Sequence, residues 1–94
     1  MSEPIQKAVE NLDSVIEQVT DEAVKNRILK VQKILSQNRK KIWLRTKSGK
    51  PMAEETLSLT NKLVNKFEDT VLVELESQAE KIEEESRRRS MVVT

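Results

Sequence analysis

The stretch KSGKP, residues 47–51, divides the 94-residue chain into two halves. Glycine is common where a helix ends, and proline fits the first turn of the next helix, so Gly49 and Pro51 mark a boundary between two helices. Glu54 and Glu55 follow in the turn where acidic side chains interact favourably with the helix dipole. We therefore expect a loop within this stretch and helical segments on both sides of it.

The half that follows the loop shows the apolar repeat of one long helix. Leu57, Val64 and Val71 recur every seven residues, and a second set of apolar residues lies three or four positions from them. Such spacing places side chains on one face of an α-helix. We predict a helix over about 52–89. The residues expected to form its core and self-assembly face are Leu57, Val64, Phe67, Val71 and Leu75.

Other apolar residues lie away from this face. Leu59, Leu63 and Val73 form a second strip on the predicted helix, and with Trp43 they are the candidate contacts for a partner. A helix over 52–89 would be about 55 Å long, more than a compact chain of this length accommodates. We therefore expect an elongated shape or a projecting helix, and a homodimer that forms a helical bundle.

The half that precedes the loop carries two apolar stripes. The stripe that starts at Ile5 and the stripe that starts at Val24 are rotated by roughly 110° from each other on a helix. One straight helix cannot bury both against one partner, and Thr20 can cap a new helix between them. The expected helices cover about 3–19 and 21–47, and the alternative is one kinked helix over 3–47.

The composition excludes β-rich folds. The chain has one Gly, two Pro, one Phe, one Trp and no Tyr, whereas β-sandwiches and barrels use turn residues and aromatic residues freely. We expect an all-α fold, either an elongated helical hairpin or a three-helix unit. It would form a single domain over 1–89, followed by a short flexible tail over 90–94.

The composition also narrows the chemistry. The chain has no His and no Cys, which removes the usual proton shuttle, the thiol nucleophile and the commonest metal ligand. We expect no enzymatic activity, cofactor, metal or small-molecule substrate.

The N-terminal segment lacks the basic stretch followed by an apolar run that is typical of a secretion signal, and the longest apolar runs in the chain are three residues. These features predict an intracellular protein, cytoplasmic or nuclear (or nucleoid-associated), that is neither secreted nor transmembrane.

Charge is strongly segregated along the chain. Residues 1–24 carry a net charge of −5, residues 25–50 carry +10, residues 51–86 carry −7 and residues 87–94 carry +3. In a hairpin turning at Gly49, basic groups would gather at the loop and acidic groups at the other end. The basic end of one copy could then bind the acidic end of another copy or a charged surface of another protein, because their charges are complementary. Our leading hypothesis is a non-enzymatic interaction or assembly protein, a small subunit or adaptor.

The basic segment supports an alternative function. Residues 25–50 contain no acid, and their cations could contact the phosphates of a nucleic acid. The chain lacks a zinc-finger, basic-zipper or RNP signature, so such binding would be mainly electrostatic. The candidate nucleic-acid-binding residues are Lys30, Lys33, Arg39, Lys40, Lys41, Arg45, Lys47 and Lys50.

Two shorter motifs are open to interpretation. Residues 40–45 contain an apolar triplet with cations on both sides, a pattern found in helices that lie on a membrane surface. This stretch is one or two turns long, so membrane binding is not the expected function. Ser90 follows three arginines and is a possible phosphorylation site. The arginines also have a purely structural explanation, because each lies four residues after a glutamate.

Overall fold

The computed structural model describes residues 3–38 and 44–92, which form four α-helices. The helices are α1 Glu3–Gln18, α2 Glu22–Asn38, α3 Met52–Asn65 and α4 Asp69–Val92. The predicted all-α class is therefore confirmed for these residues. The predicted number of helices is wrong, because the segment expected to form one helix over 52–89 forms two.

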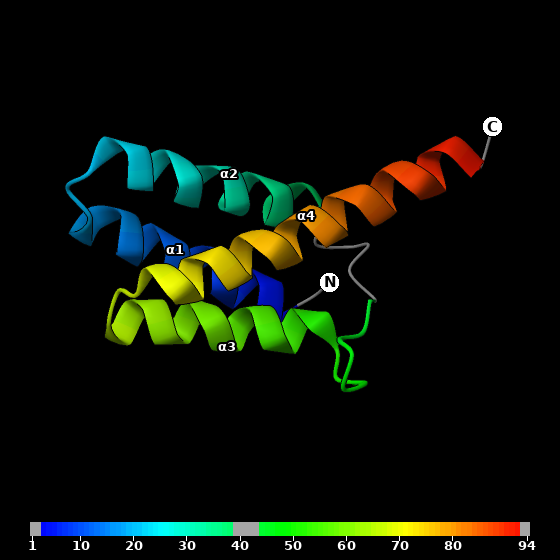
Figure 1. The fold of residues 1–94 in the computed structure, drawn as a ribbon, viewed down its shortest axis with the longest axis horizontal. Helices are drawn as coiled ribbons and strands as arrows, with labels where there is room; N and C mark the ends of the chain where they lie inside the picture. The colour runs from blue at the N-terminus through cyan, green and yellow to red at the C-terminus, as the bar shows by residue number, and fades with distance from the viewer. Residues whose placement is uncertain (1–2, 39–43, 93–94) are drawn as a thin grey trace.

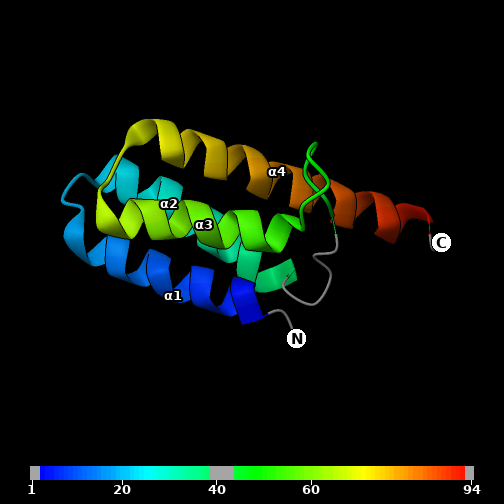
Figure 2. The ribbon, with the colours of Figure 1, turned by 90° about the horizontal axis from the view of Figure 1, so that it is seen from below.

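The four helices pack as a bundle of two helix pairs, α1 with α2 and α3 with α4 (Figures 1 and 2). Helix α1 contacts α2 and α3, and helix α4 also contacts α2 and α3. Within the described residues, α2 and α3 therefore lie diagonally across the bundle, as do α1 and α4. Helices α1 and α3 run in the same direction, opposite to α2 and α4 (Figure 1). The α1–α2 and α3–α4 connections consequently lie at one end of the bundle.

The core receives side chains from all four helices. Ile5 and Leu12 of α1 are completely buried, as are Ile28 and Leu35 of α2. Helices α3 and α4 contribute further leucines, including Leu59, Leu63, Leu72 and Leu75. No buried side-chain nitrogen or oxygen in the described part of the chain lacks a hydrogen-bond partner. The described core is therefore built from all four helices of one chain, and its buried polar side-chain atoms are hydrogen-bonded.

The break between α3 and α4 has a clear physical cause. Leu63 and Leu72 are both buried, yet nine residues separate them, which places them on opposite sides of a straight helix. At Lys66 the backbone becomes extended, with φ −159° and ψ 122°, and α4 begins at Asp69. The chain thereby reverses direction and both leucines reach the same core.

This reversal also corrects the predicted shape. The bundle measures 43 × 26 × 23 Å and has a radius of gyration of 13.0 Å. That radius is close to the value expected for a compact chain of this length. The expectation of an elongated hairpin is therefore wrong, whereas the alternative, a projecting helix, agrees with α4 (Figures 1 and 2).

The start of α2 also differs from the prediction. The carboxylate of Asp21, and not the hydroxyl of Thr20, caps the helix. Its Oδ1 accepts hydrogen bonds from the backbone N–H of Ala23 at 2.8 Å and of Val24 at 3.4 Å. Because residues 19–21 are not helical, the alternative of one kinked helix over 3–47 is wrong.

The segment before α3 is a small hairpin where the prediction placed a helix up to residue 47. The backbone N–H of Thr46 donates to the carbonyl of Lys50, and that of Met52 donates to the carbonyl of Leu44, both at 2.9 Å. Gly49 has a φ of 86°, a conformation that other residues rarely adopt. Gly49 therefore serves this turn and not the end of a helix. We refer to residues 44–51 as the hairpin.

Helix α4 is longer than the helices it packs against and projects beyond them (Figures 1 and 2). Its last buried apolar residue in the described core is Ile82, whereas the helix continues to Val92. Residues 90–92, which the prediction assigned to a tail, are thus helical. Residues 93–94 lie outside the described part of the chain.

Candidate interaction surface beside helix α4

A hollow of about 230 Å³ lies between the hairpin and the outer part of α4. The hairpin and the start of α3 contribute apolar side chains to it, whereas α4 contributes charged ones. The lining residues are Leu44, Arg45, Met52, Lys81, Glu84, Glu85 and Arg88.

The four lining residues of α4 occupy one face of the helix. Lys81, Glu84, Glu85 and Arg88 are separated by three, four and seven positions, the spacing of a helix contact strip. Arg88 Nη2 donates to Glu84 Oε1 at 3.0 Å, and both side chains are more than half exposed. On the hairpin, Arg45 Nη1 donates to the carbonyl of Gly49 at 2.7 Å. Charges of both signs therefore surround the hollow, a chemistry that suits a polar helix or peptide.

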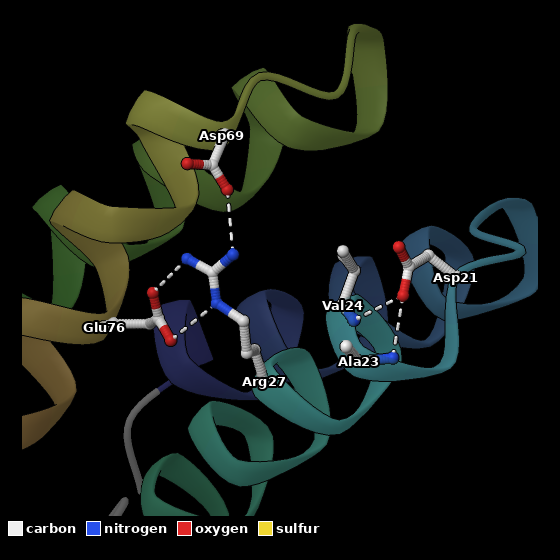
Figure 3. A network of polar contacts seen from close by, with 6 residues as sticks. All are labelled: Asp21, Ala23, Val24, Arg27, Asp69 and Glu76. Atoms are coloured by element: carbon white, nitrogen blue, oxygen red, sulfur yellow. Dashed lines mark hydrogen bonds and ion pairs between the residues drawn. The ribbon is translucent and has the colours of Figure 1, made fainter.

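A second charged cluster joins α2 to α4 (Figure 3). Arg27 donates from Nε and Nη2 to the two carboxylate oxygens of Glu76, at 3.1 and 2.6 Å, and from Nη1 to Asp69 at 2.8 Å. These hydrogen bonds, first to Glu76 and then to Asp69, raise the pKa of the Arg27 guanidinium. Each of the three side-chain nitrogens of Arg27 therefore donates to a carboxylate of α4, and we assign this cluster a structural role in packing α2 on α4.

The predicted self-assembly face lies mostly inside the bundle. Leu75 is completely buried, and Leu57, Val64 and Val71 are partly buried against the core. Phe67, in contrast, lies in the α3–α4 connection with 39% of its surface exposed, so its assignment to the core of the chain is wrong. The face expected to hold two copies together is thus largely used within one copy.

The candidate partner contacts are also divided. Leu59 and Leu63 are each 1% exposed, so they are core residues of this fold and not surface contacts. Val73 is 51% exposed on α4, in agreement with a surface position. Trp43 lies outside the described residues.

The candidate nucleic-acid-binding residues do not form one straight face. Lys30 and Lys33 are exposed on α2, whereas Arg45, Lys47 and Lys50 are exposed on the hairpin. Arg39, Lys40 and Lys41 lie outside the described residues. Lys30 also borders a small hollow that Glu76 and Glu80 line, so acidic groups lie close to it.

The predicted separation of charge between the two ends is wrong. Because the chain reverses after α3, Lys66 lies at the end of the bundle where Asp21 caps α2 (Figure 1). Glu84 of α4, by contrast, lies beside the hairpin. Charges of both signs are therefore present at each end.

The structure adds three observations on the other expectations. Ser90 lies within α4, near its C-terminal end. Among the described residues, no group of three or more acidic side chains is arranged to hold a metal ion. In the same part of the chain, no helix has the length and apolar character needed to cross a membrane.

The charged strip on α4, residues 83–89, is a candidate site that the sequence did not predict. On their own, the glutamate–arginine spacings predict only added support for the helix. The order of charges, Glu-Glu-Glu-Ser-Arg-Arg-Arg over 83–89, is the signal that identifies it as a surface of its own.

Comparison of the chain with protein-family models, curated proteins and solved structures finds no match.

Proposed function

We propose that this chain is a non-enzymatic interaction or assembly protein that binds a protein partner through the outer part of α4. The hollow beside the hairpin forms part of the contact surface. The bundle serves as a rigid base that holds this surface, and the chain acts as a small subunit or adaptor.

The observation that carries the proposal is the length of α4 beyond its own core. After Ile82 the helix continues for ten residues, 83–92. Isolated helices of this length are marginal in water, so the segment depends on the bundle and on the Glu84–Arg88 ion pair to stay helical. A preformed helix of this kind can dock on a partner at a low cost in conformational entropy.

Site-specific photo-cross-linking in the native host tests this proposal. A photoreactive amino acid replaces Glu84 on the candidate surface, and the matched control carries it at Lys33 on the exposed side of α2. We expect a discrete protein adduct from position 84 and none from position 33. The identified protein, once purified, should bind the wild-type chain and lose affinity for the Glu84→Arg/Glu85→Arg variant. Equal adducts at both positions, or none, would contradict the proposal.

The exposed cations of the hairpin favour nucleic-acid binding as a second candidate function. Arg45, Lys47 and Lys50 lie within six residues and are all exposed. Phosphate contacts of this kind weaken steeply with salt. Fluorescence anisotropy with duplex DNA and single-stranded RNA, at about 50 and 200 mM salt, measures this dependence. Binding that Lys47→Glu/Lys50→Glu abolishes would support this candidate, and absence of binding at low salt would exclude it.

A further inference from the structure

We infer that the partner of the α4 surface is a second copy of this chain, with the two α4 ends packed antiparallel about a two-fold axis at the level of Ser86. This inference rests on the proposed function, because it uses the same surface and names its occupant.

The order of charges on α4 is self-complementary. When two α4 helices pair antiparallel at this level, position 84 of one copy faces position 88 of the other, and the acidic positions 83–85 of one copy lie at the same level as the basic positions 87–89 of the other. An acidic segment therefore lies beside a basic segment in both halves of a symmetric contact. A parallel, in-register pair would instead place glutamate against glutamate and arginine against arginine. The charge pattern consequently selects both the orientation and the register.

The positions that would meet also share a face of the helix. Positions 81, 84, 88 and 91 follow the spacing of a helix–helix contact strip, and positions 85 and 87 flank it. The first three, together with Glu85, border the hollow. In a symmetric contact, position 81 of each copy faces position 91 of the other. The C-terminal end of each α4 helix therefore lies beside the hollow of the other copy.

The same geometry predicts a weak and salt-sensitive dimer. Glu84 and Arg88 are exposed and already form an ion pair within one helix at 3.0 Å. Pairing two copies arranges these groups as a cluster of two glutamates and two arginines, and exposed ion pairs contribute little each. The contact covers only about three helical turns, less than a standard stable interface. We expect a dissociation constant in the micromolar range, increasing with salt.

A pair of charge-reversed variants tests the inference by sedimentation velocity. Glu84→Arg/Glu85→Arg makes the strip basic, and Arg87→Glu/Arg88→Glu makes it acidic. Each variant alone should self-associate at least about tenfold more weakly than the wild type, because like charges then face one another. An equimolar mixture should form a heterodimer. Restoration on mixing cannot arise from changes within a single helix, so it separates pairing between copies from helix stability.

A matched control reverses two exposed acids elsewhere. Glu17→Arg/Glu74→Arg changes the net charge by the same amount as the basic variant, at positions outside the strip. This control should dimerise as the wild type does, and circular dichroism should show that all variants remain folded. Variants that dimerise as the wild type does, or a mixture that stays monomeric, would overturn the antiparallel pairing.

The outcome for the wild type separates this inference from the proposed function. A chain that remains monomeric at high micromolar concentration, while position 84 cross-links to a different protein, overturns the second copy as partner and leaves the proposed function standing. A monomeric chain with no adduct at position 84 overturns both.

Discussion

At the scale of single residues, a buried hydrogen bond between α3 and α4 offers a direct test of the core. Thr56 Oγ1 donates to Gln78 Oε1 at 2.9 Å, and both side chains are buried. Thr56→Val removes the donor and leaves Gln78 without its partner, so we expect a loss of about 1–3 kcal/mol in the free energy of unfolding. Urea unfolding measures it. Thr56→Val/Gln78→Leu should be less destabilised than Thr56→Val alone, and equal stability of Thr56→Val and wild type would contradict this role.

The cap of α2 gives a second test with an internal control. Asp21 Oδ1 accepts two backbone N–H groups of the first helical turn. Asp21→Ala should therefore lower the free energy of unfolding by about 0.5–2 kcal/mol, whereas Thr20→Ala should change it by less than about 0.5 kcal/mol. Thermal and urea unfolding distinguish the two substitutions. The reverse order of effects would restore Thr20 as the cap.

At the scale of the helices, the α3–α4 break changes what is expected of Phe67. If one helix ran over 52–89, Phe67 would lie on its buried face, and Phe67→Ala would cost about 3–5 kcal/mol. In the observed fold Phe67 is 39% exposed, so we expect a loss of less than about 1 kcal/mol. Leu72→Ala, at a completely buried position, should cost about 2–5 kcal/mol in the same urea titration. Similar losses for both variants would contradict the break.

The same break shows why the sequence predicted some helices better than others. Between α1 and α2 the apolar stripe changes direction beside Asp21, and the predicted boundary was close to the observed one. Between α3 and α4 there is no Gly or Pro, and a heptad through Val64 and Val71 continues across the break. The decisive signal was the half-turn offset between Leu63 and Leu72. Tertiary packing therefore overrode a continuous local pattern.

At the scale of the whole molecule, the candidate surface depends on topology. Leu44 and Lys81 border the same hollow, although 37 residues separate them in sequence. They meet because α4 folds back along the bundle and passes beside the hairpin (Figure 2). The spacing of glutamates and arginines at the end of α4 predicts charge pairs that support the helix. No local sequence pattern shows that this part of α4 lies beside the hairpin. The charges of the site were therefore predictable, and the apolar part was not.

Truncation separates the bundle from the surface that it carries. The described core of α4 ends at Ile82, so a chain ending at Glu83 should keep its cooperative unfolding transition and lose no more than about 1 kcal/mol. It should also lose all self-association, because the charged strip beyond Glu83 is removed. A chain ending at Gln78 lacks the buried Ala79 and Ile82, and it should be destabilised by several kcal/mol, on the order of other core deletions. Circular dichroism with urea and sedimentation velocity measure these two properties independently. If the chain ending at Glu83 unfolded, the outer part of α4 would belong to the core. If this shortened chain still formed a dimer, the contact between copies would lie elsewhere on the bundle.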